Sequence, residues 1–298
     1  MNLLVTGAWR DAKEYLSEIE GMGHDVKFLQ YEKDPLPCEY DWVEGVICNG
    51  LFLYHHIKRF SKLKYIQLTS AGYDRIPMDY VNKCKIGIYN ARGVYSIPMA
   101  EYAISGVLQL YKQAIFFREN QNVHSWKKHR GLMELSGKTV CIVGCGSVGS
   151  ECAKRFLAFD CKVIGIDVNL RRDKNFNSIF LLEELDRVLP LVDILVLTLP
   201  LTNKTFHMIN EEKLSLLKDG AILVNIARGA VVDHQGLIAS LSGKLGGAVL
   251  DVFEEEPLKG ESVLWDMKNV IITPHNSFQG DGNEERLKSV IMENLKNA

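Results

Sequence analysis

Short apolar runs alternate along the whole chain with longer segments whose apolar positions recur at helical spacing. This alternation is typical of α/β proteins, in which a helix connects each strand to the next parallel strand. In the first third of the chain, the runs with the length and composition of strands are residues 2–7, 25–30, 45–49, 65–70 and 86–90. The pattern therefore predicts one α/β unit with a parallel sheet in this part of the chain.

A second series of strands is predicted in the remaining two thirds. Its members are near-continuous apolar runs, as expected when helices cover both faces of a parallel sheet. They are residues 138–144, 161–167, 193–200, 221–227, 247–253 and 270–275. We expect one helix of this unit to begin near Val148 and another after Asp233, whose side chain suits an N-cap.

Three further segments complete the predicted organisation. Residues 97–117 carry a long apolar pattern that predicts a helix joining the two units. Residues 118–136 are polar, contain the sequence HSWKKHR and are interpreted as a loop or arm. Residues 282–297 have the spacing of an amphipathic helix.

Length and composition agree with a two-domain globular protein and exclude several classes of partner. A chain of 298 residues is too long for one ordinary domain, and its 47 % hydrophobic and 24 % charged residues are typical of soluble proteins. A formal net charge of −2 without a long basic run argues against nucleic acid or an anionic membrane surface as the main partner. No stretch approaches the ~20 apolar residues of a membrane helix, and no signal peptide is evident.

The cysteines and histidines do not suggest a disulfide framework or a metal site. The seven cysteines are Cys38, Cys48, Cys84, Cys141, Cys145, Cys152 and Cys161, an odd number without a C-x-x-C pair. This usage is typical of reduced thiols, so we expect a cytoplasmic protein. The neighbours His55 and His56 lack metal-ligand spacing and are expected on the surface.

The segment VGCGSVG has the glycine spacing of a dinucleotide-binding turn. Gly144, Gly146 and Gly149 form G-x-G-x-x-G between a predicted strand and a predicted helix. The first glycine permits the tight turn, the second lets a pyrophosphate approach the backbone, and the third lets the helix pack closely on the strand. The helix N-terminus presents N–H groups and a partial positive charge to the phosphates. A glycine turn without a ligand is the alternative, but the strand and helix around it favour a nucleotide.

The acid at the end of the next strand favours NAD over NADP. Asp167 can accept hydrogen bonds from both ribose hydroxyls of NAD, and its charge would repel a 2′-phosphate. Arg171 and Arg172 follow soon after, and an arginine there could hold a 2′-phosphate. NADP therefore stays open as the less favoured cofactor.

Polar side chains follow three further predicted strands. Arg228 follows the strand that ends in NIA, Asp251 lies in GAVLDVFEEEPL, and His275 closes VIITPH. Each has an ordinary alternative: a surface arginine, a solvated acid before a proline, or a structural histidine. Ligands of open α/β sheets bind at the carboxyl ends of the strands, so the joint occurrence beside a nucleotide turn favours a catalytic site.

Hydride transfer to a 2-oxo acid is the chemistry that these groups suit. A guanidinium binds the substrate carboxylate through two parallel hydrogen bonds. Reduction of the carbonyl builds negative charge on oxygen, and an imidazolium can donate the proton that this oxygen needs. A neighbouring carboxylate would hold the ring and keep the donor charged.

At this point the sequence resembles the D-isomer-specific 2-hydroxyacid dehydrogenase family over nearly its whole length. The matching blocks, in family order, are LKYIQLTSAGYDRIP, GVYSIPMAEYAI, LSGKTVCIVGCGSVG, LTLPLTNKT, ILVNIARGAVVD, GAVLDVFEEEPL and NVIITPH. The segment NSFQGDGN after His275 departs from the small-residue pattern of many relatives, and this departure bears on substrate choice.

The resemblance implies a role for each matching residue. Arg228 binds the substrate carboxylate and carbonyl, Glu256 pairs with His275, and His275 is the general acid/base. The backbone N–H groups of Ala71 and Gly72 help to hold the substrate carboxylate. Asp251 holds the nicotinamide carboxamide. Further implied cofactor contacts are Ser147 and Val148 in the glycine-rich turn, Pro200 and Thr205 near the adenosine, and Ala227. No metal is implied.

The resemblance also implies an architecture. The family has two Rossmann-like parallel-sheet domains, one flavodoxin-like and one NAD-binding, with a cleft between them. Here the substrate domain would comprise residues 1–97 plus 276–298, and the NAD-binding domain residues 98–275. Family members are usually homodimers, and the stretch around Trp126 matches the dimer arm.

The leading hypothesis is a dehydrogenase that reduces a small 2-oxo acid with NADH. Two alternatives share the same residues: an NAD(H)-binding corepressor that acts through protein contacts, and a phosphite dehydrogenase. Within the leading hypothesis, hydroxypyruvate, glyoxylate and branched 2-oxo acids stay open as substrates. Arg75 is the one evident extra cation near the SAGYD loop, which is too few to assign a phosphorylated substrate.

Overall fold

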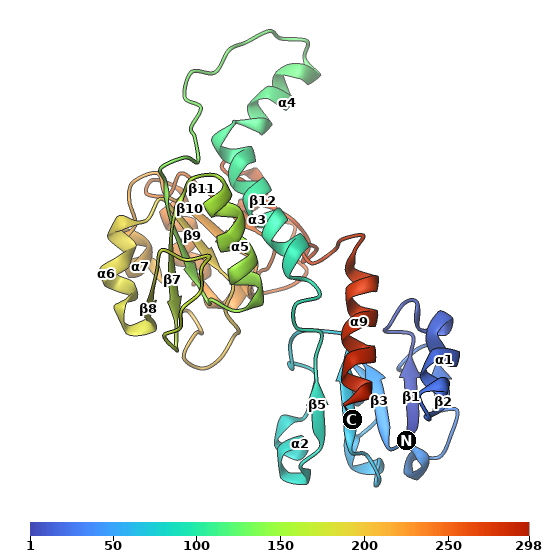
Figure 1. Cartoon of the computed structure of the whole chain (residues 1–298). Coiled ribbons are helices and arrows are strands. Elements are labelled where there is room, and N and C mark those ends of the chain that lie inside the picture. The colour runs from blue at the N-terminus through green and yellow to red at the C-terminus, as the bar shows by residue number, and fades with distance from the viewer. Residues whose placement is uncertain (298) are drawn as a thin grey trace. The chain divides into compact units, whose positions relative to one another are not determined.

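The computed structural model describes residues 1–297, which divide into two compact units. One unit comprises Met1–Tyr95 and the chain from Gly280 onward, and the other comprises Ser96–Gln279. The expected boundaries, after residues 97 and 275, lie two and four residues from these. Each unit is built on one parallel sheet, which confirms the predicted α/β class (Figure 1).

The unit that contains the N-terminus has a five-stranded parallel sheet in the order β2-β1-β3-β4-β5. Its strands are β1 (Asn2–Thr6), β2 (Asp25–Leu29), β3 (Gly45–Cys48), β4 (Tyr65–Leu68) and β5 (Gly87–Tyr89), and its helices are α1 (Ala12–Gly21), α2 (Met78–Cys84) and α9 (Asn283–Lys296). The predicted amphipathic helix is thus confirmed as α9. Its apolar face, with Leu287, Ile291 and Leu295, belongs to the same buried cluster as Leu3 and Val5 of β1.

The second unit has a seven-stranded parallel sheet in the order β12-β11-β10-β9-β6-β7-β8. Its strands are β6 (Thr139–Val143), β7 (Lys162–Asp167), β8 (Ser178–Leu181), β9 (Ile194–Leu197), β10 (Ile222–Asn225), β11 (Gly247–Leu250) and β12 (Val270–Ile272). Its helices are α3 (Ser96–Tyr111), α4 (Ala114–Asn122), α5 (Ser147–Ala158), α6 (Leu185–Val188), α7 (Glu211–Leu216) and α8 (His234–Leu241). Asp233 caps α8 as predicted, because its side chain accepts a hydrogen bond from Gly236 N.

The order of the strands creates a switch point between β6 and β9. From β6 the chain adds β7 and β8 on one side of the sheet, and then adds β9 to β12 on the other. Two buried clusters, one on each face, explain the near-continuous apolar runs of the strands. In sheets of this kind the crevice at the switch point is the place where ligands bind.

The sequence prediction missed one strand and joined two helices. Strand β8 has no fully buried residue, so its four residues lack the long apolar run that marked the other strands. The single helix expected over 97–117 is wrong, because Gln113 adopts a left-handed conformation (φ 54°) between α3 and α4. No glycine or proline marks this break. The expected loop over 118–136 consequently begins only after α4.

The expectation that the His55–His56 pair lies on the surface is wrong for His55. Only 6 % of His55 is exposed, and its ring lies between Tyr40 OH (2.8 Å from Nδ1) and the Asp34 carbonyl (3.1 Å from Nε2). These partners fit a ring whose Nδ1 faces the Tyr40 hydroxyl and whose Nε2–H donates to the Asp34 carbonyl. His56 is exposed as expected.

Across residues 1–297, no helix is long and apolar enough to cross a membrane.

Candidate active site and cofactor site

The glycine-rich turn after β6 has the geometry of a phosphate-binding loop. Gly144 has φ +95°, and a Cβ on Gly149 would lie 2.1 Å from the Gly144 carbonyl oxygen, so both positions require glycine. A Cβ on Gly146 would meet nothing within 4 Å, so this side of the turn is open. Helix α5 begins at Ser147, and its N-cap Gly146 has no side chain to cap the first turn. The turn therefore fits a dinucleotide pyrophosphate.

Asp167 is fixed beside this turn by backbone donors. Its Oδ2 accepts a hydrogen bond from Cys145 N at 2.8 Å, and its Oδ1 accepts one from Val168 N at 2.7 Å. A carboxylate oxygen has more than one acceptor site, so the group can still accept bonds from ribose hydroxyls. The residues of this edge thus fit an adenine dinucleotide.

The other predicted cofactor residues of this unit lie at the same edge of the sheet. Val148 is in the first turn of α5, Ala227 follows β10, and Pro200 follows β9. The Thr205 hydroxyl donates to the Pro200 carbonyl at 2.8 Å and accepts a bond from Thr202 N at 2.7 Å. Thr205 therefore shapes the loop after β9, and a direct contact between Thr205 and the cofactor stays a prediction.

The turn that carries Arg228 is held by a side chain that the sequence analysis did not select. Asn225, the last residue of β10, is 1 % exposed. Its Nδ2 donates to the Arg228 carbonyl at 3.0 Å, and its Oδ1 accepts a bond from Ala227 N at 3.1 Å. The amide thus closes the turn at the point where the strand delivers the guanidinium to the edge of the sheet.

Close packing joins the Arg228 turn to the loop that carries Glu256. A Cβ on Gly229 would lie 1.8 Å from the Phe253 carbonyl carbon and 2.3 Å from Glu254 N. Only a glycine permits this approach between the two backbones. The loop after β9 also joins them, because His207 N donates to the Ala230 carbonyl at 2.8 Å and the His207 ring contacts the Glu254 carboxylate.

Replacing Gly229 by alanine is expected to separate these two loops. The methyl group would overlap backbone rather than a movable side chain, so we expect a loss of ~1–3 kcal/mol in the free energy of unfolding. The displaced Arg228 turn should also lower kcat/KM for any reaction that depends on this guanidinium at least tenfold. Thermal denaturation and steady-state kinetics would measure both effects. Gly243→Ala is the matched control, because a Cβ there meets nothing within 4 Å; equal behaviour of the two variants would contradict the packing argument.

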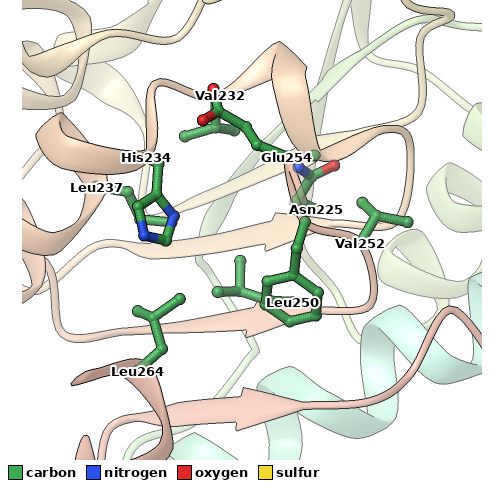
Figure 2. Close-up of a pocket in the computed structure, with 10 residues that line it drawn as sticks. Asn225, Val232, His234, Leu237, Leu250, Val252, Glu254 and Leu264 are labelled. Atoms are coloured by element: carbon green, nitrogen blue, oxygen red, sulfur yellow. The ribbon is translucent and has the colours of Figure 1, made fainter. Parts of the chain in front are cut away.

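A small pocket is lined in part by Asn225 and Gly229, which flank Arg228 in its turn (Figure 2). Asn225, His234 and Glu254 supply its polar groups, and the rest of its wall is mainly apolar. The apolar residues are Val232, Leu237, Leu250, Val252, Phe253 and Leu264. The pocket belongs to the packing that supports the turn, and we assign no ligand to it.

The predicted acid–histidine pair is present. His275 Nδ1 lies 2.9 Å from Glu256 Oε2, while Glu256 Oε1 accepts a hydrogen bond from Phe253 N at 3.0 Å. With Nδ1 engaged by the carboxylate, Nε2 is the ring nitrogen that can exchange a proton with a substrate. The side chains of His275 and Glu256 are 44 % and 38 % exposed, so a substrate can reach them.

Asp251 fixes the turn that carries His275. Its carboxylate, in a residue that is 1 % exposed, accepts hydrogen bonds from Thr273 Oγ1 (2.5 Å), Asn276 N (2.7 Å) and Ser277 N (2.9 Å). Because three donors hold the carboxylate, Asp251 stabilises the turn that carries His275. The contact between Asp251 and the nicotinamide carboxamide stays a prediction.

A half-buried tyrosine extends this network. Tyr102 OH lies 2.7 Å from Thr273 Oγ1, and because the single Thr273 proton serves Asp251, Tyr102 is the donor to Thr273. Burial raises the pKa of Tyr102, so its hydroxyl keeps the proton that this bond requires. Both residues lie in sequence blocks that match the family, but the sequence analysis assigned no role to Tyr102 or Thr273.

The predicted substrate loop lies in the N-terminal unit. The Ala71 carbonyl accepts a hydrogen bond from Asn90 Nδ2 at 2.6 Å, and the Gly72 carbonyl accepts one from Ser70 Oγ at 3.0 Å. These bonds fix the loop through its carbonyl groups and do not use the N–H groups of Ala71 and Gly72. The predicted role of these N–H groups in substrate binding is therefore compatible with the geometry.

Comparison with known proteins identifies the family. Residues 104–277 match the NAD binding domain of the D-isomer specific 2-hydroxyacid dehydrogenases. The chain belongs to this family. Since its members exchange hydride between NAD(P)(H) and 2-hydroxy or 2-oxo acids, this 2-hydroxyacid dehydrogenase homologue is an oxidoreductase.

Relatives of known name and structure agree with this placement. The chain is 34 % identical over 242 residues to the glyoxylate reductase of Thermofilum pendens. The alignment covers 78 % of this chain and 71 % of the relative. A D-lactate dehydrogenase from Aquifex aeolicus, solved with NAD and lactic acid, superposes with a TM-score of 0.79 at 29 % identity, covering 99 % of this chain and 94 % of the other.

A third relative carries the other nicotinamide cofactor. A family member from Xanthobacter autotrophicus Py2, solved with NADPH and MES, has a TM-score of 0.82 at 28 % identity and covers 99 % of this chain and 94 % of its own. Both cofactors thus occur among structures similar to this dehydrogenase, so the choice between them rests on its own residues.

Proposed function

We propose that this dehydrogenase uses NADH to reduce a small 2-oxo acid to the D-2-hydroxy acid. The observation that carries the proposal is the His275–Glu256 pair, with 2.9 Å between Nδ1 and Oε2. Glu256 lies on the loop that packs directly against the Arg228 turn. The acid–base pair and the guanidinium are thus held by loops that pack against each other. This combination suits reduction of a carbonyl next to a carboxylate.

Arg228 binds the substrate carboxylate in this proposal, assisted by the N–H groups of Ala71 and Gly72. Its planar guanidinium can donate two parallel hydrogen bonds to a carboxylate. Asn225 supports this role, because the bond from its amide to the Arg228 carbonyl fixes the backbone from which the guanidinium extends.

His275 donates the proton that the substrate oxygen needs. The nicotinamide, when bound, supplies the hydride to C2 of the substrate. Glu256 holds the ring through Nδ1, which leaves Nε2 for the substrate. In the oxidising direction the same nitrogen accepts the hydroxyl proton.

NAD is the proposed cofactor because an acid lies where a 2′-phosphate would approach. Gly144, Gly146, Ser147, Val148 and Gly149 would cradle the pyrophosphate, and Asp167 would bind the ribose hydroxyls. The fixed Asp167 carboxylate, held by Cys145 N, supports this assignment.

We also propose that the protein is a cytoplasmic homodimer that associates through the arm after α4. All seven cysteines are free, which suits a reducing compartment. Trp126 in the arm is 98 % exposed, and an exposed large aromatic side chain favours a protein contact. Sedimentation at the mass of one chain would contradict the dimer.

The test is NADH oxidation by the purified protein with glyoxylate, pyruvate, hydroxypyruvate, 2-oxoisocaproate and phosphohydroxypyruvate, with NADPH in parallel. Turnover on at least one acid with NADH preferred is the expected result. NAD reduction by phosphite would instead indicate a phosphite dehydrogenase. NADH binding without turnover on any of these compounds would contradict the proposed reaction.

A further inference from the structure

The loop between β7 and β8 places a second carboxylate close to the glycine-rich turn. Asp173 Oδ2 accepts a hydrogen bond from Ser150 Oγ at 2.6 Å, and Asp173 Oδ1 accepts one from Asn175 N at 2.9 Å. Ser150 belongs to the first turn of α5, the helix whose N-terminus fits the pyrophosphate. Asp173 is therefore tied to the cofactor helix itself.

Close packing around Gly165 also fixes the loop between β7 and β8. A Cβ on Gly165 of β7 would lie 2.5 Å from Cys145 Sγ and 2.9 Å from Phe176 Cδ1. The glycine-rich turn, through Cys145, and the Asp173 loop, through the buried Phe176, thus pack over one glycine. Asp173 has a defined place beside the turn, although the loop that carries it is polar and half-exposed.

Asp173 is charged at neutral pH. Burial opposes the charged form, but the hydrogen bonds from Ser150 and Asn175 and the nearby Arg171 and Lys174 hold the pKa of Asp173 below its usual value. Asp173, Asp167 and Arg171 all lie near enough to Cys145 to act on its thiol electrostatically. Arg171, a candidate for binding a 2′-phosphate, therefore lies within electrostatic range of the Asp173 carboxylate.

We propose that Asp173 is a cofactor-specificity residue, which disfavours NADP(H) by adding a second negative charge near the glycine-rich turn that also holds Asp167, and by partly offsetting the positive charge of Arg171. This inference rests on the proposed function, in which Asp167 binds the ribose of the adenosine. A 2′-phosphate carries up to two negative charges, so two fixed carboxylates repel the NADP(H) adenosine. The ribose hydroxyls of NAD(H) are uncharged, so NAD(H) binding is not opposed in this way.

Asp173→Asn tests the proposal, because the amide oxygen can still accept the bond from Asn175 N, while the amide NH2 group can donate to the Ser150 hydroxyl. Dissociation constants for NADH and NADPH would be measured by titrating nicotinamide fluorescence at low ionic strength. We expect NADPH to bind ~10-fold more tightly and NADH to change by less than ~2-fold. Because exposed charges are screened, the gain should shrink at high salt.

Asp219→Asn is the matched control. It removes the same charge, but Asp219 precedes β10 at the opposite edge of the sheet and pairs with Lys244 at 2.6 Å. The control should leave the ratio of NADPH to NADH affinity unchanged. Adding Arg171→Ala to Asp173→Asn should remove part of the gain in NADPH affinity, because the positive charge of Arg171 contributes to that gain once the Asp173 charge is absent.

Two results would overturn the proposal. One is an unchanged affinity ratio in Asp173→Asn, and the other is an equal loss of both cofactors, which would indicate a packing role alone. A failure of the proposed function looks different: wild-type protein would bind NADH but turn over no 2-oxo acid, and the affinity ratio could still be measured.

Discussion

Replacing His275 by asparagine is expected to lower kcat for 2-oxo acid reduction by ~10³-fold, since a general acid typically contributes ~10²–10⁴-fold. Asparagine is the informative substitution, because His275 has φ +51° and asparagine tolerates this left-handed conformation better than alanine. Its backbone N–H can also keep the 2.8 Å bond to the Asp251 carbonyl. NADH affinity, measured by fluorescence titration, should change by less than a factor of about two, because the imidazole acts on the substrate oxygen.

Two controls separate chemistry from structure. Glu256→Gln should fall between wild type and His275→Asn, because its one oxygen can still accept a bond from the ring, but the side chain lacks the negative charge and the second acceptor that Phe253 N uses. His56→Asn, at an exposed histidine of the other unit, should leave kcat unchanged. Undiminished kcat in His275→Asn would remove His275 from the mechanism.

The second large effect is expected at Arg228. Arg228→Lys keeps the charge but loses the planar fork, so we expect kcat/KM for the 2-oxo acid to fall ~100-fold, equivalent to ~3 kcal/mol. The KM for NADH should change little. The steady-state parameters for both substrates, measured separately, would show this split.

The matched control for Arg228→Lys is Arg187→Lys. Arg187 makes an exposed i,i+3 pair with Glu184, and its side chain is 80 % exposed. A surface pair of this kind contributes little, so the kinetics should match the wild type. If Arg228→Lys raised the KM for NADH and left that for the acid unchanged, Arg228 would be a cofactor residue instead.

The fold was predictable where apolar periodicity was strong. The runs buried on both faces of the second sheet appear as β6, β7 and β9 to β12, because a strand covered by helices must be apolar throughout. Periodicity does not report a break set by one residue's backbone, so the left-handed Gln113 between α3 and α4 was missed. The half-buried β8 at the sheet edge had too short a run to stand out.

The candidate site divides in the same way. Residues with distinctive chemistry at strand ends, such as Arg228 and His275, could be selected from sequence. Their supports could not, because Asn225, Gly229 and Thr273 act through contacts with residues distant in sequence: a closed turn, a backbone approach and a buried carboxylate. Glycine and asparagine are common in ordinary turns, so only the three-dimensional contacts distinguish these positions.

The position of α9 in the N-terminal unit has a consequence for synthesis. The apolar face of α9 completes the cluster around Leu3 and Val5, yet α9 is translated after all of Ser96–Gln279. At ribosomal speeds of ~5–20 residues per second, the first 95 residues wait on the order of 10–40 s for their last helix. During that interval the second unit is itself being synthesised, and the nascent N-terminal sheet lacks the helix that covers the cluster around Leu3 and Val5. A chaperone could bind the apolar face that this leaves exposed.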